Sequence, residues 1–289
     1  METINGYELT TPLSADHSGF GRWGFARKDG LEVFIKEFLS PVYPLHPEMF
    51  FDSELEHRIA ACDRFVRSKQ MIYSKLNQCD NGNIIVVLDF FRYGAKYYIV
   101  TEKVDDSSLT PNEIYALNDP AKTVLIAKVI CNNLHELHRH GIIHADLKPG
   151  NILLKKTASG FFTAKIIDFD SSFLEGQPFP HEELEGDPVY LAPEMFRAMQ
   201  GQRVELTSKI DVFAIGVLLY QFFFGTLPMF RGAEDAYAFE SVLVNRELLF
   251  PDKADKHLKK LLTSMLQENP KKRPDLKKVL AVLDKVQKK

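Results

Sequence analysis

Four polar side chains in two short segments have the types and spacing that phosphoryl transfer requires. The first segment, His144 to Asn151 (His-Ala-Asp-Leu-Lys-Pro-Gly-Asn), supplies Asp146, Lys148 and Asn151 between two apolar runs. The second ends in Asp168, directly after two isoleucines. Apolar flanks of this kind predict short buried strands that hold a polar loop open to solvent.

Phosphoryl transfer depends mainly on positioning and on neutralisation of charge. Asp146 can orient a hydroxyl group and accept its proton, while Lys148 can neutralise charge on the migrating phosphoryl group. Asn151 and Asp168 offer hard oxygen ligands that suit Mg²⁺. The two segments therefore predict a phosphoryl-transfer site.

At these residues the chain resembles the protein kinase family, whose catalytic loop and metal loop have nearly this spacing. Three further segments resemble family motifs in the same order: Val33-Phe34-Ile35-Lys36 (Val-Ala-Ile-Lys), Gly186 to Glu194 (Gly-Thr-Pro-x-Tyr-x-Ala-Pro-Glu) and Asn269 to Pro274 (Asp-Pro-x-x-Arg-Pro). In the family, the residue at Arg273 pairs with the one at Glu194. The resemblance extends from about Leu13 to Pro274.

The resemblance implies an α+β, bilobal protein-kinase-like fold, with a single kinase domain over residues 1–289. Residues 1–104 would form the N-lobe and hinge, a small five-stranded antiparallel sheet with one main helix. Residues 105–289 would form a mainly helical C-lobe. At Thr110-Pro111-Asn112-Glu113, a capping box with proline at the first helical position predicts the start of the helical lobe.

Local patterns predict where the strands and the helix of the small lobe lie. Strand signals occur in five segments: Tyr7–Leu13, Gly24–Lys28, Glu32–Phe38, Asn83–Phe91 and Lys96–Val104. Asp29-Gly30 predicts a hairpin between the second and the third. Three prolines mark residues 40–47 as an irregular insertion, and a helical pattern follows from about Ser53 to Asn77.

The resemblance also implies the function: an ATP- and Mg²⁺-dependent protein kinase that phosphorylates serine or threonine of protein substrates. Its catalytic residues would be Lys36, Asp146, Lys148 and Asn151, and its metal ligands Asn151 and Asp168. The nucleotide would contact a larger set: Gly19, Gly21, Trp23, Gly24, Lys36, Thr101 at the gatekeeper position, Glu102 and Val104 of the hinge, Leu153 and Asp168. In the family, a lysine two residues after the catalytic aspartate, as Lys148 is after Asp146, favours serine and threonine over tyrosine as the substrate residue.

Two alignments of the glycine-rich segment remain open. Gly19, Gly21 and Gly24 fit Gly-x-Gly-x-x-Gly literally. The distance to Lys36 favours a different register, in which Gly21 is the last loop glycine and Trp23 replaces the valine that covers adenine. In a third interpretation, Trp23 only fills the core of the small lobe.

Four positions depart from the family pattern. Ala145 replaces the arginine that, in the family, binds a phosphate on the activation loop. Regulation by phosphorylation of that loop would therefore lack the positive charge that binds the phosphate. Asp170 replaces a glycine, and aspartate tolerates positive φ better than most residues. Asp187 replaces a threonine that contacts the catalytic residues.

The fourth departure is the helix glutamate that pairs with the strand lysine in the family. No acidic residue occurs between Asp63 and Asp80, and Lys69 aligns with the glutamate. Either a carboxylate earlier in the helix (Glu54, Glu56 or Asp63) reaches Lys36, or the pair is absent. In the second case, repulsion between two cations predicts a displaced helix with Lys69 pointing to solvent.

Composition limits the other classes of function. A net charge of −3 argues against nucleic-acid or membrane binding. The three cysteines show no metal-ligand spacing, and the N-terminus lacks a signal-peptide pattern, so we expect reduced thiols and a cytoplasmic protein. His135, His138 and His140 predict a solvated helix end. The oligomeric state cannot be predicted from the sequence.

Val212 to Phe230 contains no charge and is long enough to span a bilayer. The kinase resemblance instead predicts the buried central helix of a large domain.

Two other functions stay open. A pseudokinase would bind nucleotide or partners without turnover. A small-molecule phosphotransferase of the aminoglycoside or choline kinase type shares the His-x-Asp loop, but it lacks the Ala-Pro-Glu segment and its arginine partner.

Overall fold

The computed structural model describes residues 2–15, 21–79, 82–104, 108–157, 162–233 and 235–287. The chain divides into two compact units. The small unit comprises Met1–Asp80 and Ile85–Asp106, and the large unit comprises Asn81–Ile84 and Ser107–Lys289.

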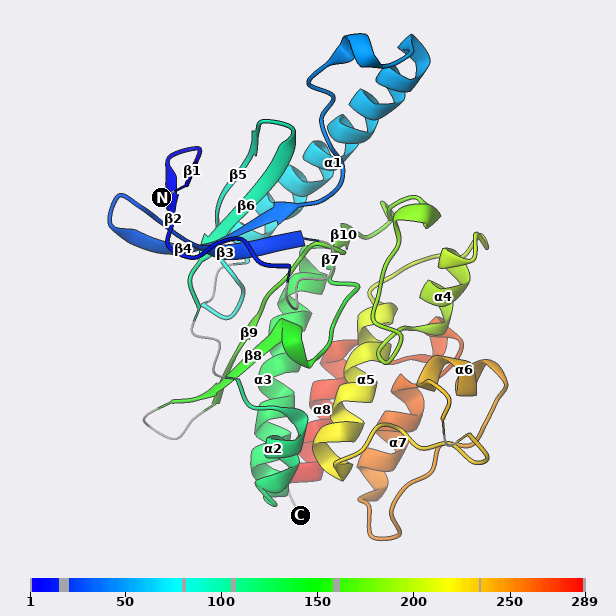
Figure 1. The fold of residues 1–289 in the computed structure, drawn as a ribbon. Helices are drawn as coiled ribbons and strands as arrows, with labels where there is room; N and C mark the ends of the chain where they lie inside the picture. The colour runs from blue at the N-terminus through cyan, green and yellow to red at the C-terminus, as the bar shows by residue number, and fades with distance from the viewer. Residues whose placement is uncertain are drawn as a thin grey trace. The chain divides into compact units, whose positions relative to one another are not determined.

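An antiparallel sheet with strand order β1-β2-β3-β4-β6-β5 forms most of the small unit (Figure 1). Its strands are β1 (Thr3–Ile4), β2 (Tyr7–Leu9), β3 (Gly21–Lys28), β4 (Leu31–Phe38), β5 (Val87–Tyr93) and β6 (Lys96–Glu102). The five predicted strands are all present, and the described residues add a sixth, β1.

Two tight turns with positive φ explain the N-terminal half of the sheet. Asp29 (φ 52°) and Gly30 (φ 79°) join β3 to β4, as predicted. Asn5 (φ 49°) and Gly6 (φ 83°) join β1 to β2 in the same way. Asn-Gly is a strong hairpin signal, so the extra strand had a signature in the sequence.

The main helix of the small unit is α1 (Asp52–Gln78), within one residue of its predicted bounds at each end. The insertion before it contains only a short 3₁₀ turn, η1 (Pro47–Met49). Residues 52–58 of α1 are exposed apart from the half-buried Leu55. The C-terminal half is anchored instead, through Ile72, Tyr73 and Leu76, which are buried.

The two faces of the sheet pack against different partners. On one face, Val33 and Ile35 contribute to an apolar core with Ile4, Tyr7 and Leu9 of the β1–β2 hairpin. Side chains alternate along a strand, so Phe34, Lys36 and Phe38 point to the opposite face. There α1 packs on the sheet through Phe65, whose ring lies 5.0 Å from that of Phe38.

Helices dominate the large unit: α2 (Pro111–Ala116), α3 (Pro120–Arg139), α4 (Pro193–Met199), α5 (Lys209–Phe224), α6 (Ala238–Leu243), α7 (Lys256–Met265) and α8 (Leu276–Gln287). Three 3₁₀ turns, η2 (Pro149–Asn151), η3 (His181–Glu183) and η4 (Pro270–Lys272), interrupt its loops. The described strands form two small pairs, β7 (Ile142–Ile143) with β10 (Phe173–Leu174) and β8 (Ile152–Lys156) with β9 (Phe162–Ile166).

Local sequence explains how several of these helices begin and end. The predicted capping box is present at Thr110 and Glu113, so α2 starts where expected. Helix α3 begins at Pro120, earlier than the pattern near Thr123 indicated, because Asp119 caps it by accepting from two backbone amides. It ends before Gly141, whose φ of 70° is easily adopted by glycine.

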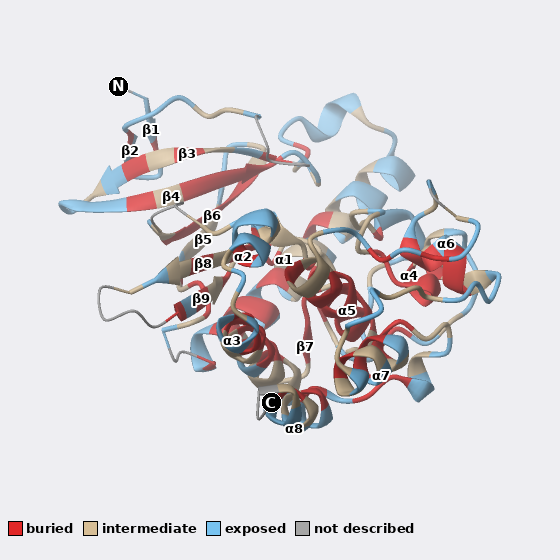
Figure 2. Ribbon diagram, turned by 90° about the horizontal axis from the view of Figure 1, so that it is seen from below, coloured by how far each residue is buried: buried red, intermediate tan, exposed pale blue. Residues whose placement is uncertain are grey.

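Helix α5 is the buried centre of the large unit. Figure 2 shows it as buried along almost its whole length, between α3 and α7. Gly216 permits close packing, since a Cβ there would lie 3.0 Å from Met265 of α7. The prediction of a central helix is therefore confirmed, and no helix among the described residues is long and apolar enough to cross a membrane.

Candidate active site

Asp146, Lys148 and Asn151 are brought together in one hydrogen-bonded cluster of the large unit. The Lys148 ammonium lies 2.6 Å from Oδ2 of Asp146. The Asn151 amide donates to the same oxygen at 3.0 Å and to the Asp146 carbonyl at 2.8 Å. The Asp146 side chain keeps 14% of its surface exposed, so the carboxylate remains open to a reacting group.

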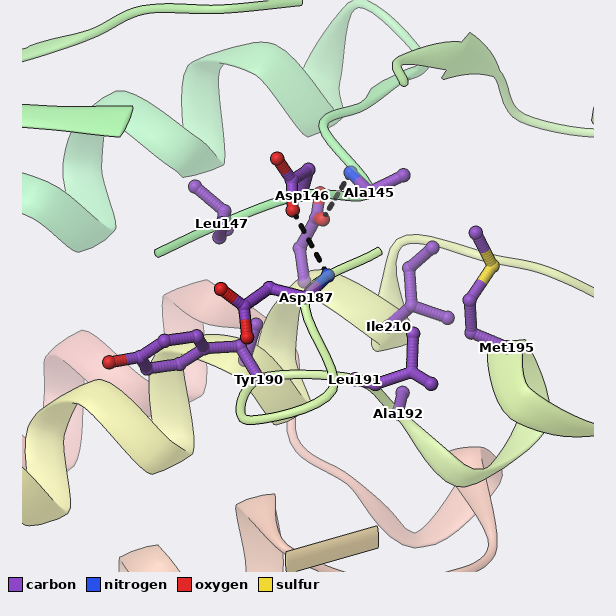
Figure 3. A pocket seen from close by; sticks show the side chains of 11 residues that line it. Ala145, Asp146, Leu147, Asp187, Tyr190, Leu191, Ala192, Met195 and Ile210 are labelled. Atoms are coloured by element: carbon purple, nitrogen blue, oxygen red, sulfur yellow. Dashed lines mark hydrogen bonds between the residues drawn. The ribbon is translucent and has the colours of Figure 1, made fainter. Parts of the chain in front are cut away.

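Asp211, at the start of α5, holds the backbone on which Asp146 sits. Its carboxylate accepts from the amides of His144 and Ala145, each at 2.9 Å, and contacts His138 Nε2 at 2.8 Å. Figure 3 draws the bond from Ala145. Ala145 has a φ of 67°, a conformation that costs an L residue of order 1–3 kcal/mol. The bonds to Asp211 therefore hold the loop in a strained conformation.

The charge of Asp211 is stabilised although the residue is 1% exposed. Burial by itself raises the pKa of a carboxyl group, but the hydrogen bond and charge of His138 and the contacts with His144 bring the pKa of Asp211 below its ordinary value. His138, whose side chain is 11% exposed, is thus a partner of Asp211, and the prediction that the three histidines form a solvated helix end is wrong for this residue.

The role of Asp211 was missed in the sequence. Its signal was a carboxylate directly before a long uncharged run of the same helix, because a buried carboxylate needs hydrogen-bond donors from elsewhere in the chain.

The predicted metal loop lies directly against the catalytic loop. Ile167 N–H donates to the Asn151 carbonyl at 3.0 Å, and His144 Nε2 donates to the Ile167 carbonyl at 3.0 Å. The next residue, Asp168, has a φ of 61°, and Phe169 is buried with its ring 4.9 Å from that of His144. Positive φ therefore occurs at Asp168 and not at Asp170, where the replaced glycine had suggested it.

Asp187 contacts Asp146 through its backbone. Its N–H lies 3.3 Å from Oδ1 of Asp146, as Figure 3 shows, while its own carboxylate accepts from the amide of Val189 at 2.9 Å. Tyr190 fixes the same segment by donating to Gln221 of α5 at 2.9 Å, and its burial raises the pKa of its hydroxyl to about 12. The segment that replaces Gly-Thr-Pro is therefore held beside the catalytic carboxylate.

The predicted ion pair of the large unit is present. Arg273 donates to both oxygens of Glu194, at 2.6 and 2.8 Å, and their side chains are 0% and 4% exposed. Arg273 also donates to the carbonyls of Gln267, Lys209 and Glu268, so that its charge is hydrogen-bonded throughout. A bidentate pair of this kind fixes the start of α4 relative to η4.

In the small unit, Lys36 lies on β4 directly opposite Trp23 of β3. Paired residues of an antiparallel ladder share a face, so both side chains lie on the α1 side of the sheet. Gly21 is on the same face, and a Cβ there would lie 2.9 Å from Cε of Lys36. Gly24 faces the other way, against Thr11 and Pro12. Of the two glycines of this segment that the structure describes, Gly21 therefore lies over the lysine and Gly24 does not, which favours the register with Trp23 in the valine position.

Other predicted nucleotide contacts lie where their strands place them. Thr101 is buried on β6, and its hydroxyl donates to the Glu102 carbonyl at 3.3 Å, while the N–H of Glu102 donates to the Val86 carbonyl at 3.2 Å. Val104 follows the end of that strand, and Leu153 lies on β8 in the large unit. Gly19 lies outside the described residues.

Lys69 does not point to solvent, and that prediction is wrong. It is 1% exposed, and its ammonium lies 5.6 Å and 5.7 Å from the ring centres of Phe38 and Phe65. The faces of aromatic rings attract a cation, so this site accepts a lysine where the family has glutamate. Of the acidic alternatives, Glu54 pairs with Arg58, while Glu56 and Asp63 are exposed.

Comparison with known proteins agrees with this geometry. The family model of the protein kinase domain matches residues 64–282, which is more than half of the chain. The chain belongs to the protein kinase family. The bilobal α+β prediction is therefore confirmed, with a sheet-rich small unit and a helical large unit.

Curated relatives of this kinase-family chain include several serine/threonine kinases. The chain is 31% identical over 189 residues to serine/threonine-protein kinase dkf-1 of Caenorhabditis briggsae, covering 64% of this chain and 24% of the relative. It is 31% identical over 216 residues to serine/threonine/tyrosine-protein kinase HT1 of Arabidopsis thaliana, covering 73% and 52%. A probable myosin light chain kinase of Dictyostelium discoideum is 28% identical over 210 residues, with 71% and 66% covered. The chain thus spans a quarter to two thirds of these relatives.

Proposed function

We propose that the chain is an ATP- and Mg²⁺-dependent protein kinase that transfers the terminal phosphoryl group of ATP to serine or threonine hydroxyls. The observation that carries this proposal is the cluster of Asp146, Lys148 and Asn151, joined by bonds of 2.6 to 3.0 Å on a loop strained by Ala145. Strained backbone is retained where a fixed geometry is needed.

Each member of the cluster has one task. Asp146 orients the substrate hydroxyl, whose oxygen forms a bond to the terminal phosphorus as the bond from that phosphorus to the bridging oxygen of ADP breaks. The hydroxyl proton passes to Asp146. Lys148, already within 2.6 Å of that carboxylate, places a positive charge beside the phosphoryl oxygens during transfer.

The predicted nucleotide contacts fall in each of the two units. In the small unit, Lys36 would bind the α- and β-phosphates while the Gly21 backbone passes over its side chain. Trp23 would cover the adenine, and Thr101, Glu102 and Val104 would line its edge, with the Glu102 carbonyl accepting from the base. In the large unit, Leu153 would contact the base. Gly19 and Gly24 complete the glycine-rich segment. The lack of a side chain at Gly24 allows the segment at Thr11 to pack closely against it.

The donor set suits Mg²⁺. Mg²⁺ keeps several waters and uses one or two protein ligands beside the phosphates of a nucleotide. Asp168 offers a carboxylate, and Asn151 offers its amide oxygen because its amide nitrogen already donates to Asp146. Bound there, the ion would neutralise phosphate charge.

Specificity for serine and threonine rests on Lys148 and on the names of the relatives, one of which is a serine/threonine/tyrosine kinase. The test is phosphorylation of a mixed protein substrate by the purified chain, followed by mass-spectrometric mapping of the sites. We expect phosphoserine and phosphothreonine in Mg²⁺-ATP and none with an Asp146→Ala control. Modification of tyrosine alone would overturn the specificity.

One observation favours a second candidate, a pseudokinase. Lys69 is buried beside the rings of Phe38 and Phe65, at a position where active relatives are expected to carry a glutamate. A Mg²⁺-dependent ATPase measurement against Asp146→Ala separates the two, because a pseudokinase shows no difference between them.

We also propose that the chain acts as a single kinase domain in the cytoplasm. Cys62, Cys79 and Cys131 are buried thiols that form no disulfide within the described residues, as reducing conditions favour, and burial raises the pKa of Cys131 to about 12. The net charge of −3 supports a protein substrate over nucleic acid.

A further inference from the structure

The insertion before α1 exposes an unusual density of large apolar side chains. Five of them fall within thirteen residues: Leu39, Val42, Leu45, Met49 and Phe51. Met49 is 74% exposed and Phe51 83%, and both lie at the turn that leads into α1. Large apolar side chains exposed in such numbers indicate an interaction site.

This apolar turn is also acidic. Residues 47–56, which we call the acidic tip, contain Glu48, Asp52, Glu54 and Glu56 and no lysine or arginine. Arg58 neutralises Glu54 at 2.9 Å and lies over the Phe50 ring at 4.7 Å. His46 Nδ1 lies 3.2 Å from Glu48, and Asp52, Glu56 and the exposed Phe51 face a partner that combines positive charge with apolar surface.

A cavity of matching chemistry lies further along the same helix. It has a volume of about 520 Å³, within the range of sites that bind ligands, and lies between α1, β5, β6 and Tyr43. Tyr43, Phe90 and Tyr97 form apolar walls, and Arg67 and Arg92 outnumber the one acidic lining residue, Asp63. We call it the aromatic–arginine cavity. Arg92 stacks over the Tyr43 ring at 4.1 Å, leaving a planar charged group at the wall.

An apolar stripe of α1 connects the two features. Leu55, Ile59 and Val66 follow one another at intervals of four and seven residues, so they lie on one face of the helix. Leu55 and Ile59 are half-buried, and Val66 lines the aromatic–arginine cavity. The acidic tip and the aromatic–arginine cavity thus lie at two places along the same stripe of α1 and have opposite charge.

We propose that two copies of this chain associate through their α1 helices, with the acidic tip of each copy seated in the aromatic–arginine cavity of the other. Phe51 and Arg67 are sixteen residues apart, about 24 Å along a helix. In an antiparallel pair, a two-fold axis passing Ile59 at the midpoint brings each Phe51 to the level of the partner copy's cavity. Such an isologous arrangement is the commonest symmetry of homodimers.

Opposite charge selects a second copy over other occupants, because the tip contributes carboxylates where the cavity contributes guanidinium groups. This inference does not depend on phosphotransfer. Every residue that it uses belongs to the small unit.

Sedimentation equilibrium of the full chain tests the association. We expect a monomer–dimer equilibrium, with a dissociation constant raised at least about tenfold by Phe51→Asp or by Arg67→Glu. The matched control is Leu31→Asp, which places the same charge on a side chain 57% exposed in β4, outside both surfaces, and should change nothing. Circular dichroism verifies that each variant is folded.

A charge exchange makes the test specific. One variant carries Arg67→Glu and Arg92→Glu, and another carries Glu48→Lys and Asp52→Lys. Each should be monomeric alone, while an equimolar mixture should form a heterodimer because both tip–cavity contacts regain opposite charges.

Three results would overturn the proposal: a wild-type chain that stays monomeric up to about 100 µM, an equal effect of Leu31→Asp, or a mixture that does not associate. If the wild type is monomeric but binds a peptide of residues 47–58, the cavity serves a segment of another protein and self-association is wrong.

Discussion

Trp23 and Lys36 are paired residues of the β3–β4 ladder, and the indole of Trp23 stacks on Phe34 with ring centres 5.6 Å apart and planes inclined by 22°. Phe25 closes the group from the side at 5.9 Å. The face that carries the lysine therefore presents stacked aromatic rings beside an ammonium group. Trp23 is both part of this packing and beside Lys36, so the two interpretations of the residue are compatible.

The first prediction uses Trp23 as a reporter, since it is the only tryptophan of the chain. Addition of Mg²⁺-ATP should change its fluorescence saturably, because the base lies against the indole. Lys36→Ala should shift the midpoint to at least about tenfold higher ATP through the loss of a charged hydrogen bond. Trp23→Phe should abolish the signal but retain nucleotide binding in a dialysis assay. Binding of ATP by dialysis with no fluorescence change in the wild type would show that Trp23 does not contact the base.

Local signals predicted most of the fold correctly. Three of these signals are the turn at Asp29-Gly30, the capping box at Thr110 and the helical periodicity of α1. Each depends on residues a few positions apart, so the nearby sequence contains its cause. The two-residue strand β1 is too short for an alternating pattern, although Asn5-Gly6 marks its turn.

Contacts between distant residues could not be predicted in the same way. The burial of Lys69 depends on Phe38 and Phe65 lying beside it, which follows from how α1 packs on the sheet. The bond from His138 to Asp211 joins residues 73 positions apart. By contrast, Asp146, Lys148 and Asn151 lie within six residues, and their motif was sufficient to find them.

The second prediction concerns Asp211→Asn. An amide has one acceptor oxygen, so it cannot accept from the His144 and Ala145 amides and contact His138 as a carboxylate does. We expect a loss of about 1–3 kcal/mol in the free energy of unfolding. Turnover should also fall, because Ala145 is released from its strained conformation.

The same variant has a defined pH dependence. Folding lowers the pKa of Asp211, so the unfolded chain binds more protons and the stabilisation rises with pH in that window. The difference in unfolding free energy between wild type and Asp211→Asn should be complete above about pH 4, the pKa of an unfolded aspartate. It should shrink as the pH falls through the lower pKa of the folded state. Urea titrations between pH 3 and about pH 7 measure it, and a difference that grows on acidification would contradict the assignment.

The third prediction distinguishes the role of Lys69 from that of the family glutamate. Lys69→Glu places a carboxylate against the negative faces of Phe38 and Phe65, so it should lower the free energy of unfolding by more than about 2 kcal/mol. Lys69→Met, of similar length and without charge, is the matched control and should be far less damaging. If Lys69→Glu instead increases phosphotransfer without loss of stability, position 69 faces Lys36 after all.

The fourth prediction concerns regulation. Ala145 offers only a methyl group where an arginine would receive a phosphate, and it packs against the apolar core of the large unit. Phosphatase treatment of the purified chain should therefore leave activity within about twofold, because position 145 offers no positive charge to bind a phosphate on the activation loop. Loss of more than about tenfold would mean that another cation, such as Arg139 or Lys165, binds a phosphate.

Transfer of the terminal phosphoryl group of ATP to a serine- and threonine-containing protein, compared between the wild type and Asp146→Asn, tests the central claim most directly. The substitution keeps the shape of the side chain and removes the base, so we expect transfer to slow by about 10²- to 10⁴-fold. Thermal unfolding and the Trp23 nucleotide titration should stay unchanged. Equal rates for the two proteins, or no transfer by the wild type in Mg²⁺-ATP, would contradict the assignment of this site to phosphoryl transfer.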